Sequence, residues 1–470
     1  MENAWWLKIL LWLKGNWYEP FTLIVLLPLS FWVGYKATNF LLIGSPYTFL
    51  SGDLWWASRI VGLILAAIIF FIWLLSRRYP KAHKDKVGII IAIRSNTLEA
   101  ERIRNDVVEK FLEIMKGSGV SKYLDLLVLK DFQAKKVIDE KSALRVSNKC
   151  AGAFVIWGKS LSYRVDNGNN QYGFDLSYQV RHKPLVPPAQ AMVAQGFQEA
   201  LVNKKWEFLE KDTLRGIRIT AANIREVALY VIGIAAYVSY DFSTSKDFHL
   251  EVYKLLSEDK AKKKSLSPVF QRVPIFISDS LHIIGYSIYL NEKDVDKALG
   301  FAEQAITFWP QNANAHTNKA LYLFQLGDIE GAKKTIKKVR QLNARIHIWD
   351  SAWRYSEAFL LFLDKKFPEG FSSYKKAFNG YTSDRSVDEV VTFLEVFLKN
   401  NPDKVQLIFA LALIRLYKKD DKPKALEEFE TFMEQTQGSA EFSFLFKKAE
   451  AYKNQITKNS KTSIANSSAQ

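Results

Sequence analysis

The sequence holds one cysteine, Cys150, among 470 residues. A single cysteine excludes an intrachain disulfide framework and a metal cluster held by several cysteines. Six histidines are present but form no His-x-x-x-His or Cys–His grouping, so a zinc or nucleophile site lacks ligands at a recognised spacing. Neither a Gly-x-Ser-x-Gly elbow nor a Gly-x-Gly-x-x-Gly loop occurs. We therefore expect no catalytic residues, no metal and no cofactor, and we do not predict an enzyme.

Charge and composition bound the remaining classes. Hydrophobic residues make up 48% of the chain and charged residues 24%, which excludes wholesale disorder. A length of 470 residues predicts two or three domains. The formal net charge of +16 favours anionic partners, either lipid head groups or nucleic acid.

Two uncharged runs, Pro20 to Tyr35 and Ile60 to Leu75, dominate the beginning of the chain, and each is 16 residues long. With their flanking tryptophans and tyrosine they approach the ~20 residues that a spanning helix needs. We predict a membrane anchor over residues 1–76 that is a two-helix transmembrane hairpin, with spans at about 17–36 and 55–76. Pro28 predicts a kink or local break in the first span. Residues 4–13 lie in the interface or begin that span.

Two alternatives to the hairpin are a signal peptide and a pair of buried core helices. The first run begins late for a signal peptide and a second run follows it closely. Core helices normally carry a polar stripe, which Ile60 to Leu75 lacks. Both observations favour the hairpin.

The residues after the second run set its orientation. Residues 77–86 form a basic juxtamembrane linker whose expected lipid head-group contacts are Arg77, Arg78, Lys81, Lys84 and Lys86. The positive-inside rule then places both termini in the cytoplasm and residues 37–53 outside, which predicts a multi-pass protein of the cell (inner or plasma) membrane. Anionic lipid offers about 1 kcal/mol per basic side chain here. We therefore expect membrane lipid, rather than nucleic acid, as the anionic partner.

A small α/β domain is predicted over residues 87–183. Its expected elements are strands Val87–Ile93, Leu124–Leu129 and Ala153–Trp157, helices Leu98–Lys116 and Lys141–Lys149, and a hairpin with arms Leu161–Val165 and Tyr172–Val180. The runs VGIIIAI and CAGAFVIWGKSL and the alternating hairpin resemble the amino-terminal α/β domain of the TolB family. This resemblance implies an interaction or sensing domain and no known enzyme.

The tripeptide Gly158-Lys159-Ser160 invites comparison with a phosphate-binding loop. That motif needs a glycine five residues before the Gly-Lys pair, and the residue there is Ala153. The intervening residues are those of a strand, whereas the motif needs a flexible loop of exposed amides. We predict the end of a strand.

The prolines of residues 184–188 mark the next boundary. An all-α domain is predicted over residues 189–452, beginning with a helix from 189 to about 203. Residues 223–240 are apolar almost all round, but the uncharged part is too short to span, so we expect a buried helix there. Residues 453–470 are rich in Asn, Ser, Thr and Lys and should form a disordered tail.

Helical repeats are clearest over residues 279–346. Ala298 and Ala332 occupy the same small position in successive second helices, 34 residues apart, and Pro310 ends the first of these units. A third unit begins near Ser351, and a fourth covers residues 406–439. Residues 387–402 resemble a further second helix. These features resemble tetratricopeptide repeats (TPRs) over residues 279–439, so the expected fold is multidomain: hairpin, α/β domain and TPR-like array.

The resulting functional hypothesis is a membrane-anchored scaffold or adaptor that faces the cytoplasm and binds a protein or peptide through its array, as an inserted helix or an extended segment. Homo-oligomerisation stays open. The candidate partner-binding residues are Asn314, Asn318, Tyr322, Arg354 and Tyr355, which could equally pack between repeats. The alternative is a membrane receptor-effector whose α/β domain senses a small anionic, nucleotide-type signal, as in bacterial defence. Arg94, Lys130 and Lys159 would then bind the signal.

Overall fold

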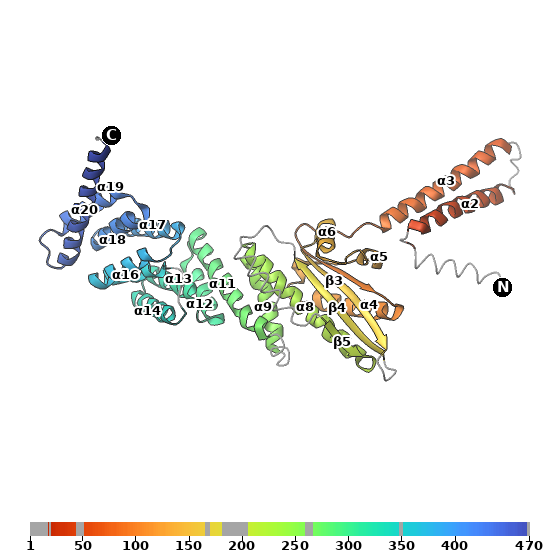
Figure 1. Ribbon diagram of the computed structural model, residues 1–470, viewed down its shortest axis with the longest axis horizontal. Coiled ribbons are helices and arrows are strands. Elements are labelled where there is room, and N and C mark those ends of the chain that lie inside the picture. Colours follow the sequence, from red (N-terminus) through yellow and green to blue (C-terminus); the bar gives the residue numbers. More distant parts are fainter. Residues whose placement is uncertain are drawn as a thin grey trace. The chain divides into compact units, whose positions relative to one another are not determined.

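The computed structural model describes residue 17 and residues 20–43, 51–164, 170–180, 205–258, 267–346 and 351–467. The chain divides into two compact units, Met1–Ala235 and Ala236–Gln470. Figure 1 shows the apolar helices, the sheet and the helical array in chain order. The predicted interfacial segment 4–13 and the predicted helix 189–203 lie outside the described residues.

Two apolar helices, α2 (Pro20–Ile43) and α3 (Ser51–Ser76), pack against each other. Their backbones approach closely where Gly34 faces Gly62: a Cβ on Gly34 would lie 2.9 Å from the Cα of Gly62. Helix α2 continues through Pro28, so no break occurs there. The side chains of α3 that face outward are apolar, including Leu63 and Phe71, which are 61% and 63% exposed.

Among the described residues, three helical segments are long and apolar enough to cross a membrane, judged by length and composition alone, and residues 22–37 of α2 form a shorter apolar segment. Residues 59–76 of α3 are 11% buried, whereas the segments 210–238 and 269–291 are 67% and 44% buried. The second segment contains α8 (Thr213–Val238), whose residues 227–232 are buried all round. It is a buried helix, as the sequence predicts for residues 223–240.

The α/β domain is built on a five-stranded sheet with the order β2-β1-β3-β4-β5. The strands are β1 (Val87–Ser95), β2 (Leu124–Val128), β3 (Phe154–Arg164), β4 (Asn170–Val180) and β5 (Lys205–Leu209). Strand β1 is parallel to β2 and β3, and β4 is antiparallel to β3 and β5. The predicted third strand and first hairpin arm are one strand, β3.

The connection from β1 to β2 and the connection from β2 to β3 cross the sheet in opposite directions. Because such crossover connections are right-handed, helices cover both faces of the sheet. They are α4 (Leu98–Lys116), the short α5 (Asp131–Ala134) and α6 (Glu140–Cys150), with 3₁₀ turns at Ser121–Tyr123 and Glu210–Asp212. Thr97 caps α4 by accepting a bond of 3.0 Å from the amide of Ala100. Ala134 of α5, Val137 between the two helices, and Val146 and Cys150 of α6 form one core with Ile90, Val155 and Trp157.

Gly158 and Lys159 lie in the middle of β3, where both pair with β1 and β4, rather than at a strand end. Gly158 has φ of +150°, and a Cβ there would lie 2.0 Å from the carbonyl oxygen of Asp175. The glycine is therefore required by the close approach of β4. Its backbone amides belong to a sheet and not to a phosphate loop.

Strand β5 corrects a predicted boundary. Residues 205–209 pair with β4, although the sequence analysis assigned them to a helical domain beginning at 189. Helix α8 also belongs largely to the first unit, and a Cβ on its Gly216 would lie 2.2 Å from the ring of Phe208 on β5. The sequence pattern did not reveal β5 because the strand is short and is followed closely by a long apolar helix.

The second unit is a helical array. Its helices are α9 (Phe242–Glu258), α11 (Ser267–Asn291), α12 (Val295–Phe308), α13 (Ala313–Gln325), α14 (Ile329–Ile346), α15 (Trp353–Leu363), α16 (Phe367–Asn379), α17 (Asp384–Asn400), α18 (Gln406–Ile414) with a π-helical end at Arg415–Lys419, α19 (Lys422–Thr436) and α20 (Ser443–Ser467).

Four helix pairs repeat along the array: α11/α12, α13/α14, α15/α16 and α18/α19. Small residues lie where the paired helices meet: Ala298, Ala332, Ala358, Ala377 and Ala425 are completely buried. A Cβ on Gly370 would lie 2.4 Å from the ring of Phe362 on the paired helix. The TPR-type architecture predicted from the 34-residue step is confirmed by these pairs.

The carboxy-terminal segment differs from its prediction. Helix α20 extends from Ser443 to Ser467, whereas disorder was expected from residue 453. Leu445, Ala449, Tyr452 and Ile456 are buried and continue a helical spacing of three and four residues, so packing overrides the polar composition.

Candidate functional site: a concave groove in the helical array

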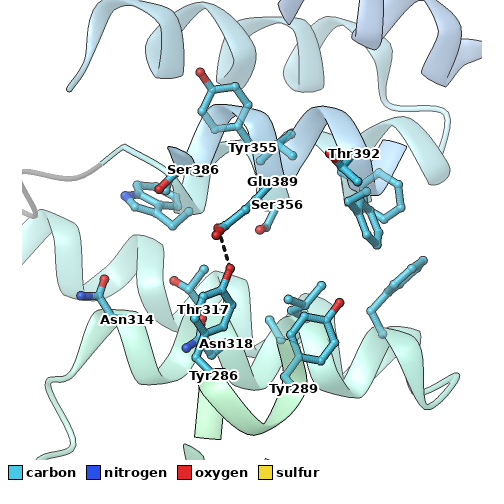
Figure 2. Close-up of a pocket in the computed structure, with 18 of the residues that line it drawn as sticks. Tyr286, Tyr289, Asn314, Thr317, Asn318, Tyr355, Ser356, Ser386, Glu389 and Thr392 are labelled. Atoms are coloured by element: carbon cyan, nitrogen blue, oxygen red, sulfur yellow. Dashed lines mark hydrogen bonds between the residues drawn. The ribbon is translucent and has the colours of Figure 1, made fainter. Parts of the chain in front are cut away.

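A groove of about 960 Å³ opens in the helical array. Its lining comes from α11, α13 and α15, the first helices of three successive pairs, and from α17. Figure 2 shows side chains from these helices pointing into the space between them. The volume lies within the range of ~300–1,000 Å³ that is typical of ligand sites.

Helix α17 does not belong to a repeat. Contacts between first helices run from α11 to α13, from α13 to α15, and from α15 directly to α18. The sequence analysis assigned residues 387–402 to a second helix. The structure instead makes α17 an insertion whose Phe393 and Phe397 rings contact Phe324 of α13 and Phe359 of α15 at centroid distances of 5.2–6.2 Å.

Helix α17 is a fixed wall of the groove. Val387, Val391 and Leu394 are buried in the main hydrophobic cluster of the array. Full burial of such a side chain is worth about 1.5–3 kcal/mol, so these three alone hold α17 with roughly 5–9 kcal/mol. That approaches the whole binding free energy of a micromolar complex, about 8 kcal/mol. A ligand of the groove would therefore bind beside α17 rather than in its place.

One hydrogen bond joins the two walls. The hydroxyl of Tyr286 on α11 donates to Glu389 Oε2 on α17 at 2.5 Å, and Arg385 Nε donates to Glu389 Oε1 at 3.0 Å. Figure 2 shows the Tyr286–Glu389 bond crossing the middle of the groove. Burial, together with the Glu389 carboxylate, raises the pKa of Tyr286, so the phenol stays protonated and keeps donating.

Aromatic rings form part of the floor. Tyr286 stacks on Tyr289 with centroids 6.1 Å apart, and Tyr289 meets Tyr322 at 5.3 Å. Gln325 Nε2 donates to the Tyr289 hydroxyl at 2.6 Å, which fixes the ring. The rings of Tyr286 and Tyr289 offer a rigid apolar surface with polar edges, and the buried Tyr322 packs against Tyr289.

Neutral polar side chains make up much of the remaining lining: Asn314, Thr317, Asn318, Gln325, Ser356, Ser386 and Thr392. The formal charges cancel, since Lys293 and Arg385 oppose Asp388 and Glu389. Burial lowers the pKa of His282 to about 4, so this lining residue is neutral at pH 7. The groove is therefore not basic, although the chain carries a net charge of +16.

The predicted partner-binding residues divide into two groups. Asn314, Asn318 and Tyr355 line the groove, although the ring of Tyr355 points away from the Tyr286–Glu389 bond (Figure 2). Tyr322 is completely buried, and Arg354 lies over the ring of Trp353 at 4.4 Å and outside the lining. Tyr286, Tyr289 and the residues of α17 were not predicted as partner-binding residues. The position of α17 across the first helices leaves no signal in a repeat pattern.

A buried polar cluster fixes α11 against its neighbours. Asn312 donates to Ser278 Oγ at 2.9 Å and to Asp279 Oδ1 at 3.1 Å, and the Tyr237 hydroxyl donates to Asp279 Oδ2 at 3.4 Å. Burial raises the pKa of Asp279 to about 6. Among the described residues, no group of three or more His, Cys, Asp or Glu side chains could hold a metal ion.

The basic residues of segment 77–86 are exposed, except for half-buried Arg77. The segment itself is docked on the α/β domain rather than free. The amide of Ala82 donates to the Cys150 carbonyl at 2.8 Å, and the amide of His83 donates to Asp125 Oδ2 at 2.9 Å. Tyr79 packs on the core beside α6, and Lys149 lies 5.0 Å from its ring.

Comparisons with known proteins give no family: no family model matches the chain, and no curated protein matches it. Among solved structures, PilF of Pseudomonas aeruginosa aligns with 16% identity and a TM-score of 0.24, over 56% of this chain and 99% of PilF. A human IFIT1 dimer with PPP-AAAA gives 17% and 0.29, over 53% and 58% of the two chains. The P58(IPK) TPR domain gives 13% and 0.17, over 57% and 87%. TM-scores this low do not support a conclusion about the fold. The TPR-type architecture is established by the helix pairs of the chain itself.

Proposed function

We propose that this chain is a membrane-anchored scaffold that holds an extended peptide segment of a partner protein in the groove of its helical array. The observation that carries the proposal is the neutral, aromatic and amide-rich lining between the first helices and α17. Amide side chains can bond the backbone of an extended peptide, and the rings can take its apolar side chains. The absence of net positive charge in the lining argues against a nucleic-acid ligand.

The Tyr286–Glu389 bond favours an extended segment over a helix. It joins the walls at 2.5 Å in the middle of the groove. A helix with its side chains is about 10–12 Å across and would have to break this bond. An extended strand is narrower and fits beside it.

Photo-crosslinking from inside the groove tests the scaffold. A photoreactive amino acid replaces Thr317, which lines the groove, or Lys334, which is exposed on the second helix α14. In native membranes, a discrete adduct should form from position 317 and be lost on Asn318→Arg, which fills the groove with a charged side chain. The position 334 adduct pattern should not respond to Asn318→Arg. Identical patterns from both positions would contradict a groove-bound partner.

The membrane anchor is the second part of the proposal. Helices α2 and α3 would cross the cell membrane as a hairpin, with both termini in the cytoplasm and the basic residues of 77–86 at the inner head groups. The apolar, outward-facing surface of α3 supports this assignment. Protease added to intact cells should leave the array uncut, and added to inverted vesicles should digest it. Cleavage of the array in intact cells would exclude the orientation.

The receptor-effector alternative gains no support from Lys130 and Lys159, two of its three basic residues. Lys130 Nζ donates to the Ser76 carbonyl at 2.6 Å, and Lys159 lies 4.0 Å from Asp175. Both cations thus have partners within the protein. We retain the scaffold as the function that the geometry supports best.

A further inference from the structure

The end of α3 is held by the α/β domain. Lys130 Nζ donates to the Ser76 carbonyl, and Gln133 Nε2 donates to the carbonyls of Arg77 and Arg78 at 3.1 and 3.2 Å. Carbonyls at a helix end lack intrahelical partners and favour a nearby cation. Gln133 is only 1% exposed, so this contact is built into the fold.

These bonds set the position of α5 relative to the end of α3. The uncharged run of α3 ends at Leu75, so Ser76 lies at the level of the head groups if α3 spans the bilayer. Helix α5 lies within hydrogen-bond distance of that residue. The guanidinium of Arg77 and the ammonium of Lys136 lie 5.9 and 5.8 Å from the ring of Phe132 on α5. Residues that continue from α5 into α6 therefore begin beside the membrane.

The exposed side chains of this region combine charge and apolar area. We define the α5–α6 surface by its exposed basic and apolar residues Lys135, Lys136, Ile138, Lys141, Leu144, Arg145 and Lys149, and the acids Asp139 and Glu140 are exposed there too. Ile138 is 64% exposed and Leu144 is 42% exposed. Exposed apolar side chains flanked by Lys and Arg are the pattern of a surface that lies in a membrane interface.

The opposite face of the sheet provides the contrast. Segment 130–149 has six basic and three acidic residues, and one of the acids, Asp131, is already paired with Arg104 and Lys135. Helix α4, which packs on the other face, has four basic and five acidic residues. The domain is thus polarised, with its basic side on the helices that hold the end of α3.

We infer that the α5–α6 surface binds the anionic phospholipid head groups of the membrane in which α3 is anchored. The basic side chains pair with phosphates and carboxylates of the lipid, while Ile138 and Leu144 enter the interface. This site adds to the head-group contacts expected for segment 77–86, and it rests on the proposed membrane anchoring. It would keep the α/β domain against the bilayer.

A label at residue 138 tests the inference on the full chain in nanodiscs. Ile138→Cys carries an environment-sensitive fluorophore, and Leu98→Cys, 87% exposed at the start of α4, is the matched control. Cys150 is buried and its pKa is raised to about 11, so it stays unlabelled. The nanodiscs contain phosphatidylcholine alone, or three parts of it to one of phosphatidylserine.

The label at 138 should shift to the blue in the phosphatidylserine nanodiscs, and the label at 98 should not. Lys135→Glu/Lys136→Glu/Arg145→Glu should abolish the shift, because each basic side chain contributes roughly fivefold to anionic-lipid binding. Arg102→Glu/Lys116→Glu on α4 should leave it unchanged. No shift at 138, in a chain that co-elutes with both nanodiscs, would overturn the inference. Failure to co-elute would instead overturn the anchoring itself.

Discussion

The α/β domain and the helical array bury different kinds of side chain. Among the described residues 87–164 and 170–180, the buried polar side chains are uncharged: Ser118, Gln133, Ser147 and Ser160. In the array, His249, His316, Glu357 and Arg415 are buried. A sheet fixes its own register through its backbone ladder, whereas stacked helix pairs have no such ladder. We interpret the buried charges of Glu357 and Arg415, which contact side chains on neighbouring helices, as contacts that fix those helices of the array in one register.

The largest effect is expected at Arg415. Its side chain is 8% exposed and contacts Glu395 on α17 and Glu428 on α19, the latter at 2.7 Å. Burial raises the pKa of Glu428 to about 7, so this carboxylate depends on its partner. Arg415→Ala should lower the local free energy of unfolding by about 3–5 kcal/mol. Amide exchange of α17–α20 in micelles measures it.

The control for Arg415 is an exposed pair within α17. Arg385 is 77% exposed and lies 3.0 Å from Glu389. Arg385→Ala should cost less than about 1 kcal/mol. Equal losses of unfolding free energy for Arg415→Ala and Arg385→Ala would mean that burial does not determine how much an ion pair stabilises the array.

The matching prediction for the sheet concerns the backbone. Gly158→Ala places a Cβ 2.0 Å from the Asp175 carbonyl at a φ of +150° and forces β3 and β4 apart. We expect a loss of about 2–4 kcal/mol, from backbone strain and overpacking. Gly300→Ala is the control, because a Cβ there meets nothing within 4 Å, and alanine should stabilise α12 by about 0.5–1 kcal/mol. Amide exchange of β3 and β4 reports the first change and exchange of α12 the second.

These two kinds of core also explain what could be predicted from sequence. The strands β1 and β2, the helix α4 and the repeat pairs carry their signal in local periodicity, and each was predicted within a few residues. Strand β5 is five residues long and pairs with β4 across an intervening segment of more than twenty residues, so no local pattern distinguishes it.

The groove was predictable only in part, for the same reason. Asn314 and Asn318 lie four residues apart on a first helix, and that spacing places them on one face. Tyr322 shares this spacing but is completely buried, with its ring against that of Tyr289. The wall formed by α17 depends on contacts such as Tyr286–Glu389, 103 residues apart, which no periodicity encodes.

A smaller effect is expected from pH, and it sharpens the role of buried charge. Burial raises the pKa of Asp279 from 3.8 to about 6, so the folded state holds its proton more tightly. The stability from this group is full below pH 3.8 and is lost as pH rises through 6. Burial lowers the pKa of His249 to about 3 and of His282 to about 4. Their contribution to the stability of the fold is therefore present above pH 6.5 and is lost as the pH falls toward these values.

Asp279→Asn separates these opposing contributions. An amide can still accept from Tyr237 and carries no charge, so the variant should gain up to about 2–3 kcal/mol at pH 7. Near pH 4, where the aspartic acid is already neutral in the folded state, the gain should disappear. Urea unfolding followed by circular dichroism at the two pH values gives the difference. A gain that is the same at both would assign it to packing instead of charge.

The smallest difference concerns exposed ion pairs in the two regions. Lys333 is 26% exposed and bridges two repeats, because its ammonium lies 2.8 Å from Glu330 and 2.6 Å from Asp364. Lys110 on α4 instead pairs with Glu113 of its own helix, at 2.7 Å. Lys333→Met should cost about 0.5–1 kcal/mol at low salt and less as salt screens the pair, and Lys110→Met should stay within about 0.5 kcal/mol. Thermal unfolding of both variants at two salt concentrations measures this. Of these two lysines, Lys333 joins separate helix pairs and Lys110 does not. A larger salt-dependent loss of stability for Lys110→Met than for Lys333→Met would show that ion pairs between repeats contribute no more than ion pairs within one helix.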